Sequence, residues 1–434
     1  MGKIITEDKV MRLLIKNGHV LDPVTNVDEV MDVLVEDEMI VKVDKNIACE
    51  ADQVIDAANQ YVMPGFIDLH VHLRDPGLEY KETIETGALA AARGGFTTIC
   101  PMPNTKPVTD CAKVVRYIVD KAKKLGIVNI LPVGAVTVGQ EGTTLADIEG
   151  MKEAGICAIS EDGKSVMSTE LYMRAMYEAK RLGLPVFAHC EDKPLVRGGV
   201  INAGKKAEEF GLKGITNAVE DTITARDIFM AKEAGCHLHL CHCSTEDSVR
   251  LVKMAKEIGV NISAEVCPHH FAMSDDEITK NHGDFKMNPP LRSRKDVNAL
   301  KEGLHEDVMD VIATDHAPHG LEENNQTMDK APFGIVGLET AFQLTMTELV
   351  KPGILTPMQM VEKLSVNPAR VLGINKGSIQ EGMPADITIA DFDKETVIDR
   401  STFLSKGRNT PFDKRKVVGV VTTTICNGNV VFTA

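Results

Sequence analysis

Short runs of apolar, β-branched residues alternate with longer amphipathic stretches through the central part of the chain. The amphipathic stretches have the apolar spacing of helices, and glycines such as Gly126, Gly183 and Gly235 follow them, as expected of helix C-caps. Eight strand–helix units in series predict an α/β fold, a parallel (β/α)8 TIM barrel. The eight predicted strands are residues 66–70, 96–100, 128–133, 156–160, 185–189, 237–241, 261–265 and 310–314.

A doubly wound open sheet is the alternative arrangement of the same units. The first predicted strand is not followed by the Gly-x-Gly-x-x-Gly pattern, which argues against a dinucleotide-binding version of that sheet.

The two ends of the chain have a different pattern, with short alternating strands and turns such as Asn17-Gly18 and Asn427-Gly428. We expect both ends to be antiparallel and to pack together as one small β-sandwich beside the barrel. The predicted domains are therefore a composite β-sandwich of residues 1–63 and 376–434 and a catalytic barrel of residues 64–375.

Composition narrows the class of protein. A net charge of −15 over 434 residues argues against a nucleic-acid or anionic membrane partner. No apolar run approaches the length of a membrane span, and Met1 to Met11 lack the apolar core of a signal peptide. Ten cysteines in such a chain indicate reduced thiols rather than a disulfide framework, so a cytoplasmic location is expected.

His70 and His72 end the first predicted strand, directly after the turn Met63-Pro64-Gly65. Residues i and i+2 of a strand point to the same face, so the two imidazoles can reach one metal ion. Two half-buried packing histidines are the simpler alternative.

Other strand ends decide between these two interpretations. In a (β/α)8 barrel the active site lies where the strands end, and metal-ligating residues follow five of the predicted strands. Their agreement in position predicts a metal site at that end of the barrel. These residues are His70 and His72 after strand one, Glu161 and Asp162 after strand four, His189 after strand five, His242 after strand six, and Asp315, His316 and His319 after strand eight.

The chain resembles the amidohydrolase superfamily and, within it, the bacterial class I dihydroorotases. The resemblance implies zinc-dependent, reversible cyclisation of N-carbamoyl-L-aspartate to dihydroorotate, a step of pyrimidine biosynthesis. It extends over nearly the whole chain. The matching segments are residues 64–77, 92–108, 188–192, 267–271, 288–292, 312–319 and 331–340.

The resemblance also implies roles for the metal-ligating residues. His70 and His72 would bind one zinc, His189 and His242 a second, and Asp162 would bridge the two. Asp315 would contact the first metal and act as general acid and base. Glu161 is a competitor for the bridge, and Lys164 stands where a carboxylated lysine would serve in another branch of the superfamily. One or two Zn²⁺ ions per subunit are expected.

By the same resemblance, Arg74, Asn104, Asn288 and His319 would hold the substrate, and Pro332, Phe333 and Gly334 would lie near it. Arg74 suits this role because a guanidinium binds a carboxylate through two hydrogen bonds. The simpler alternatives are a surface salt bridge for Arg74 and a turn for Asn104. His269, His270 and His316 are expected to support or pack against the site rather than to bind metal.

Three functions are weighed. The first is dihydroorotase, and the second is another cyclic amidohydrolase of the allantoinase or dihydropyrimidinase (hydantoinase) type. The third is a non-catalytic homologue that acts as an assembly partner. By resemblance, a homodimer is expected, and association with aspartate transcarbamoylase belongs to the same expectation.

Overall fold

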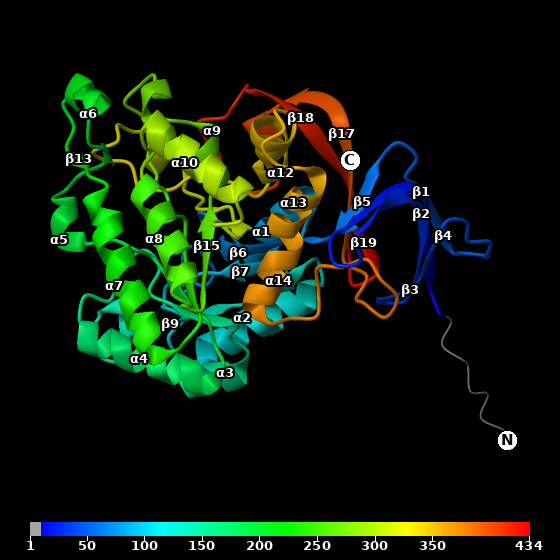
Figure 1. Ribbon diagram of the computed structural model, residues 1–434, viewed down its shortest axis with the longest axis horizontal. Helices are drawn as coiled ribbons and strands as arrows, with labels where there is room; N and C mark the ends of the chain where they lie inside the picture. Colours follow the sequence, from blue (N-terminus) through cyan, green and yellow to red (C-terminus); the bar gives the residue numbers. More distant parts are fainter. Residues whose placement is uncertain (1–9) are drawn as a thin grey trace.

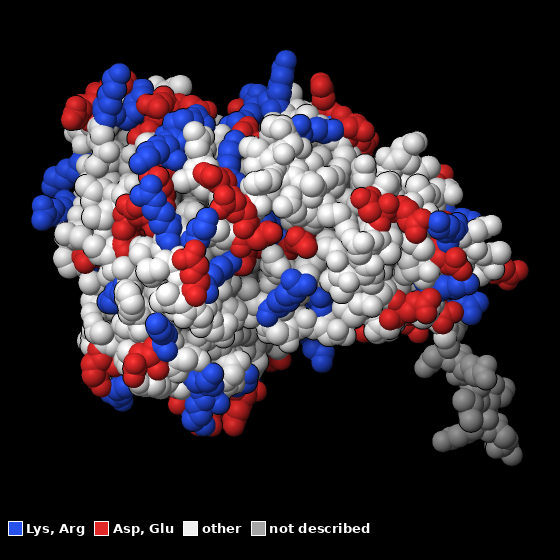
Figure 2. All heavy atoms as spheres, viewed as in Figure 1, with Lys and Arg blue, Asp and Glu red and all other residues white. Residues whose placement is uncertain are grey.

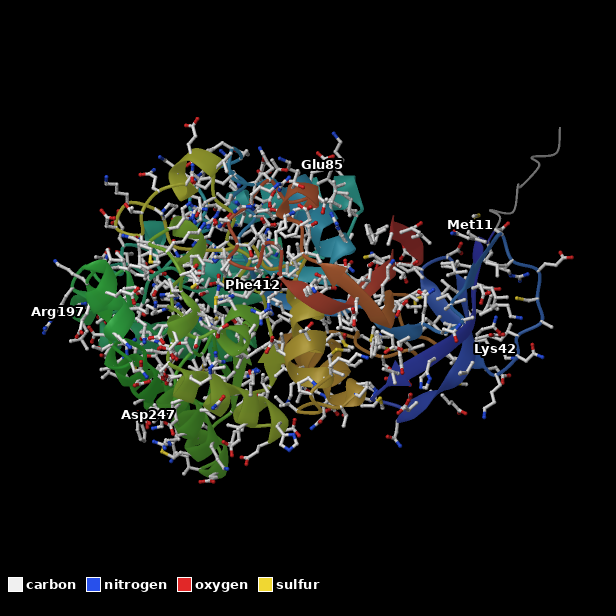
Figure 3. All side chains as sticks on the ribbon, turned by 90° about the horizontal axis from the view of Figure 1, so that it is seen from above. Met11, Lys42, Glu85, Arg197, Asp247 and Phe412 are labelled. Carbon is white, nitrogen blue, oxygen red and sulfur yellow. The ribbon has the colours of Figure 1, made fainter. Side chains whose placement is uncertain are left out.

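The computed structural model describes residues 10–434 (Figure 1). The central part of the chain forms a barrel, and both chain ends join in a sheet beside it. In Figure 3, Met11 and Lys42 of the sheet lie at the end of the molecule opposite Arg197 of the barrel. Residues 1–9 lie outside the described residues, so the prediction that no signal peptide begins the chain stays a prediction.

Parallel strands form the barrel and follow one another in chain order. The backbone amide of His72 donates to the carbonyl of His316 at 2.8 Å, which joins the last strand to the first and closes the ring. The predicted (β/α)8 barrel is confirmed. Its strands are β6 (Phe66–Val71), β7 (Phe96–Pro101), β8 (Asn129–Ile130), β9 (Val133–Ala135), β10 (Ala158–Ser160), β11 (Val186–Ala188), β14 (Leu238–Leu240), β15 (Ile262–Val266) and β16 (Val311–Ile312).

The third barrel strand differs from its prediction. Residues 128–133 were expected to form one strand, but the chain forms two pieces, β8 and β9, separated by Leu131 and Pro132. Proline has no amide hydrogen, so the ladder is interrupted at that residue.

Several of the helices that cover the barrel end at the predicted glycines. Thr83 and Ser168 cap α1 and α4, and Gly183 and Gly235 end α4 and α7 in the left-handed conformation. The longer helices are α1 (Ile84–Arg93), α2 (Ala112–Leu125), α3 (Ile148–Ala154), α4 (Thr169–Leu182), α7 (Ala218–Ala234), α8 (Glu246–Glu257) and α10 (Arg294–His305). The shorter ones are α5 (Lys193–Val196), α6 (Lys205–Phe210), α9 (Pro268–Ala272), α11 (Leu321–Asn324), α12 (Ala341–Thr345), α13 (Pro357–Val361) and α14 (Asn367–Leu372).

The two chain ends pack together, as expected, and they share one sheet in the order β19-β18-β17-β5-β1-β2-β3 with β4 beside β1. Most neighbours are antiparallel, but β1 pairs with β4 and β5 in parallel, which corrects the expectation of antiparallel pairing throughout. The strands are β1 (Arg12–Asp22), β2 (Val27–Glu36), β3 (Met39–Asp44), β4 (Gln53–Asp56), β5 (Tyr61–Pro64), β17 (Ile387–Val397), β18 (Lys416–Cys426) and β19 (Asn429–Thr433).

The sheet is attached to the barrel beside α1. The hydroxyls of Thr388 and Thr424 donate to the carbonyls of Gly95 and Ala92 at 2.6 and 2.7 Å. Between β17 and β18 the chain leaves the sheet, and Phe412 of this connection is buried where the sheet meets the barrel (Figure 3). The connection therefore brings C-terminal residues close to barrel loops.

The face drawn in Figure 2 carries acidic and basic side chains interspersed over the barrel helices. Within residues 10–434, no helix combines the length and the apolar character that crossing a bilayer requires.

Candidate active site

Metal-ligating side chains from five barrel strands meet at the carboxyl ends of those strands. They are far apart in the sequence, and the closed ring of strands brings them into one buried group. The cluster consists of His70 in β6, His72 directly after β6, Asp162 after β10, His189 after β11, His242 after β14 and Asp315 after β16.

Asp162 lies at the centre of this cluster. Its Oδ1 is 3.3 Å from Nε2 of His70 and 3.3 Å from Nδ1 of His189. The same oxygen is 3.6 Å from Nε2 of His242, and Oδ2 is 3.5 Å from Nε2 of His72. One carboxylate thus faces both histidine pairs, which is the arrangement that a bridging ligand requires.

Asp315 lies on the His70 and His72 side of the cluster. Its Oδ1 is 3.1 Å from Nε2 of His72 and 3.5 Å from Nε2 of His70. The residue has a φ of +48°, an uncommon conformation for a residue with a side chain. Such strained backbone is typical of functional positions.

The donor atoms of the cluster fit a divalent metal. Nε2 of His70 and Oδ1 of Asp162 are buried and have no hydrogen-bond partner. Nδ1 of His189 and Nε2 of His242 face each other at 2.8 Å. Buried polar atoms without partners are costly, and imidazole nitrogens with carboxylate oxygens are a donor set that zinc and similar ions prefer.

Electrostatics favours a cation at the same place. Burial alone would raise the pKa of Asp162, but His70, His189 and His242 around the carboxylate hold it well below its usual range. Burial disfavours the charged imidazole of His189, yet Asp162 and Glu191 together outweigh burial and raise its pKa to about 10. The cluster therefore holds anionic carboxylates that require positive charge beside them.

The two competitors for the bridging position point elsewhere. The carboxylate of Glu161 accepts from the backbone amide of Thr137 at 3.0 Å and from its hydroxyl. Nζ of Lys164 donates to the carbonyl of Gln140 at 2.8 Å. Of the three residues considered, Asp162 alone faces the histidines.

A buried carboxylate supports the cluster from inside the barrel. Oε1 of Glu265 accepts from Nδ1 of His70 at 2.8 Å and from the backbone amide of His242 at 3.0 Å. Oε2 accepts from Nε2 of His239 at 3.0 Å. Burial opposes its ionisation, but His70 and His239 hold the pKa of Glu265 at about 2. Sequence reasoning missed this role. The available signal was a charged residue within an otherwise uncharged strand.

A cavity of about 180 Å³ lies over the cluster. Pockets for drug-sized ligands span roughly 300–1,000 Å³, so this cavity suits a small metabolite. Besides metal-ligating residues of the cluster, its lining includes Arg74, Asn104, Gly163, Asn288, Ala317, His319, Phe333 and Gly334.

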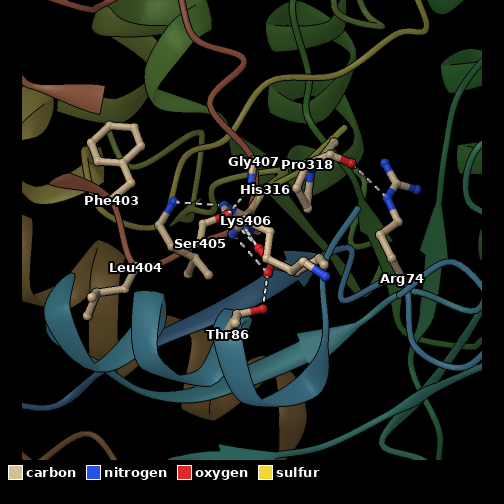
Figure 4. Close-up of polar contacts among 12 residues, drawn as sticks. Arg74, Thr86, His316, Pro318, Phe403, Leu404, Ser405, Lys406 and Gly407 are labelled. Atoms are coloured by element: carbon tan, nitrogen blue, oxygen red, sulfur yellow. Dashed lines mark hydrogen bonds and ion pairs between the residues drawn. The ribbon is translucent and has the colours of Figure 1, made fainter. Parts of the chain in front are cut away.

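Arg74 is the positive group of this cavity. Its side chain is buried, and Nε donates to the carbonyl of Pro318 at 3.2 Å (Figure 4). Within residues 10–434, no carboxylate lies within ion-pair distance of it, so the alternative of a surface salt bridge fails. Burial lowers the pKa of this guanidinium from its ordinary value. A buried positive charge without a partner is unfavourable, and an anionic ligand would compensate it.

Comparison with known proteins identifies the family. Residues 59–248 match the family model described as dihydro-orotase-like. The dihydroorotase of Acetivibrio thermocellus is 49% identical over 419 residues, which cover 96% of this chain and 98% of the relative. The dihydroorotase of Pelotomaculum thermopropionicum is 50% identical over 97% of this chain and 98% of its own length. The chain belongs to the dihydroorotase family.

Solved structures agree with the fold of this dihydroorotase family member. The L-hydantoinase (dihydropyrimidinase) from Arthrobacter aurescens has a TM-score of 0.86 at 27% identity, covering 96% of this chain and 95% of the other. The D-hydantoinase (dihydropyrimidinase) from Thermus sp. has a TM-score of 0.83 at 26% identity, covering 97% and 96%. Both the predicted family and the predicted fold class are thus confirmed.

The other residues expected to contact the substrate make different hydrogen bonds around the cavity. Oδ1 of Asn104 accepts from Nδ1 of His72 at 2.9 Å, so Asn104 also orients a histidine of the cluster. The amide of Asn288 donates to Glu191, which lies 3.7 Å from His189. Nε2 of His319 donates to the carbonyl of Phe333 at 2.7 Å. Phe333 and Gly334 line the cavity, whereas Pro332 lies outside its lining.

Three further histidines, His269, His270 and His316, were expected to support or pack against the site. His316 bonds to Glu82 at 3.2 Å and accepts from the backbone amide of Gly337 at 3.1 Å. His269 and His270 are buried, and burial lowers the pKa of both, to about 3 for His270.

Proposed function

We propose that this chain is a zinc-dependent dihydroorotase that interconverts N-carbamoyl-L-aspartate with dihydroorotate and water in pyrimidine biosynthesis. The observation that carries the proposal is the buried, unpaired Arg74 in the same small cavity as the ligand cluster. Dihydroorotate has a free carboxylate beside its cyclic amide, so the cavity offers a partner for each part. Relatives named dihydroorotase at 49% and 50% identity support the same conclusion.

In this proposal, His70, His72 and Asp315 hold one zinc, and His189 and His242 hold a second. Asp162 serves both. Divalent zinc, when bound, polarises the amide carbonyl and lowers the pKa of a water molecule. The unpaired buried atoms of His70 and Asp162 support this assignment.

Asp315 moves the proton. In the hydrolytic direction its carboxylate takes a proton from the attacking water, whose oxygen bonds to the amide carbon. The carbon–nitrogen bond of the ring then breaks, and Asp315 gives the proton to the departing nitrogen. Cyclisation is the reverse, and water leaves. Such proton transfer typically contributes on the order of 10²–10⁴-fold. His70 and His72 hold the pKa of Asp315 below its usual range against the effect of burial, which keeps it a base.

Arg74 binds the substrate carboxylate, and the other cavity residues orient the ring. Burial and the charges of Arg74 and Lys81 lower the pKa of His319 to about 3, so its imidazole is neutral. Because His319 is neutral, Arg74 is the charged partner of the substrate carboxylate, and His319 does not compete with it. Asn104, Asn288 and the Phe333-Gly334 backbone complete the proposed substrate contacts, with Pro332 behind them.

The second candidate is a hydantoinase-type activity, which the likeness to two solved hydantoinases favours. Dihydroorotate, N-carbamoyl-L-aspartate, hydantoin, dihydrouracil and allantoin distinguish the two when each is assayed with purified, zinc-loaded protein. We expect turnover of the first two and little of the other three, which have no carboxylate on the ring. Equal or faster turnover of hydantoin, dihydrouracil or allantoin would contradict the proposal.

The family resemblance also supports a cytoplasmic homodimer that associates with aspartate transcarbamoylase. The ten cysteines are all free, which suits a reducing compartment. Size-exclusion chromatography with light scattering, alone and with aspartate transcarbamoylase, tests both assemblies.

A further inference from the structure

The connection between β17 and β18 contains a stretch that crosses from the sheet to the barrel. We call residues 404–409 the crossing segment. It lies against the loop that follows β16, which carries Asp315, and against the later stretch that carries Gly334 (Figure 4). The C-terminal part of the chain thus contacts loops that line the candidate active site.

Two buried carboxylates hold the first part of the crossing segment. Glu339 accepts from the backbone amides of Leu404 and Ser405 at 2.8 and 3.1 Å. Glu82 accepts from the amide of Lys406 at 3.1 Å and from the hydroxyl of Ser405. Glu82 also bonds to His316 at 3.2 Å, so the segment is tied to the residue that follows Asp315.

Close packing continues this attachment at Gly407. A Cβ atom there would lie 2.6 Å from Val336 Cγ1 and 2.7 Å from Pro318 Cβ. A side chain at this position would therefore clash, and Gly407 packs directly against the side chains of Val336 and Pro318.

Asn409 holds the second part of the segment, and its amide is fully used. Its Oδ1 accepts from the backbone amide of His319 at 3.1 Å. Its Nδ2 donates to the carbonyls of Ala317 and Gly334 at 2.9 and 2.8 Å. Asn409 is 1% exposed, so water cannot replace these bonds. All three of its partners line the active-site cavity.

The residues that Asn409 holds are those that fix the cationic side of the cavity. Pro318 lies between two of its partners and accepts from Nε of Arg74 at 3.2 Å. Gly334 has a φ of +138°, and a Cβ there would lie 2.7 Å from Ala317 Cβ and 3.0 Å from His319 Nε2. The two loops therefore fit at short range. Asn409 joins them through its carboxamide, beside the bond from Nε2 of His319 to the carbonyl of Phe333.

We propose that Asn409 is a positioning residue for the substrate-carboxylate subsite and acts by fixing the loops that orient Arg74 and His319. This inference rests on the proposed dihydroorotase function. The C-terminal part of the chain would thus contribute to substrate binding rather than to metal binding. Among the described residues, Asn409 contacts none of the side chains of the cluster.

The test compares zinc-loaded Asn409→Ala with wild type in dihydroorotate hydrolysis. Lost positioning weakens ground-state and transition-state binding alike, so KM should rise about ten-fold or more while kcat changes less than about three-fold. Zinc content should match wild type. Asn129→Ala is the matched control, since Asn129 also joins barrel to sheet, through Thr97 and Asp386 at 3.0 and 3.2 Å, but at the amino end of β8. It should change thermal stability and leave KM unaltered.

An unaltered KM in Asn409→Ala, or an equal rise in Asn129→Ala, would overturn the inference. If Asn409→Ala does not fold, Ser405→Ala decides, because it loosens the other end of the segment. Its KM should rise about three-fold, and a wild-type KM would count against the inference. Wild type that binds zinc but does not turn over dihydroorotate would instead refute the proposed function itself.

Discussion

Glu265 accepts a hydrogen bond from Nδ1 of His70 at 2.8 Å, beneath the metal-ligating cluster. The same oxygen accepts from the backbone amide of His242, which has a φ of +34°. A non-glycine residue in this region costs about 1–3 kcal/mol and persists where its surroundings hold it. One carboxylate therefore orients a histidine from each side of the cluster.

Removing this carboxylate should weaken metal binding. Partners that orient metal ligands typically contribute 10–100-fold in affinity, so Glu265→Ala should lower zinc affinity by roughly that factor. Zinc retained after dialysis against graded chelator measures the effect. Ser263→Ala is the control, because Ser263 contacts His239 at 2.8 Å, one step further from the metal. Equal retention in both variants would refute the positioning role of Glu265.

Asp162 should be the bridging ligand. Asp162→Asn keeps the size of the side chain but removes its charge, so we expect at least half of the bound zinc to be lost and turnover to fall with it. Lys164→Ala should keep both, because Lys164 bonds to Gln140 rather than to the cluster. Metal analysis of the two purified variants decides. The reverse pattern would identify Lys164 as the bridge.

Substrate binding should require the planar guanidinium of Arg74. Arg74→Lys keeps the charge but loses the paired hydrogen bonds, and kcat/KM for dihydroorotate should fall roughly 10–100-fold. Zinc content should not change. Arg174→Lys, on the exposed face of α4, is the matched control. Turnover at the wild-type rate in Arg74→Lys would show that the substrate carboxylate binds elsewhere.

Asp227 should make stability depend on pH. Burial raises its pKa from 3.8 to about 6, despite the hydrogen bond from Arg226. The folded protein therefore favours the protonated carboxyl. The free energy of unfolding is highest below the ordinary pKa of 3.8 and falls by at most about 3 kcal/mol as pH rises through about 6. Asp227→Asn should thus gain stability over wild type between about pH 4 and 7. Thermal midpoints measured across this range test it, with Asp247→Asn as an exposed control. A difference that does not change with pH would contradict the assignment.

The positions of the cluster residues could be predicted because each depends on local pattern. An apolar run followed by a histidine or aspartate marks the carboxyl end of a strand, and the barrel brings those ends together. The sequence does not reveal which way a buried strand residue faces, because barrel closure decides that. Glu265 was expected at the end of the seventh strand, yet its contact with His70 spans 195 residues.

Asn409 could not be found in this way. It follows a strand of the chain-end sheet, where the pattern indicates only a connection. Its bond to His319 spans 90 residues, and the bond between Ser405 and Glu82 spans 323. The parallel pairing of β1 with β4 and β5 was missed for a similar reason, since alternation along one strand does not determine the direction of its neighbour.

The central claim is tested most directly by returning zinc to metal-free protein and measuring both reactions. The protein is stripped with chelator, zinc is returned in steps, and dihydroorotate hydrolysis and N-carbamoyl-L-aspartate cyclisation are measured alongside bound metal. We expect no turnover without metal and recovery of both reactions in proportion to zinc bound at the cluster of His70, His72, Asp162, His189, His242 and Asp315. Full turnover in the stripped protein, or zinc binding without turnover in either direction, would contradict the account.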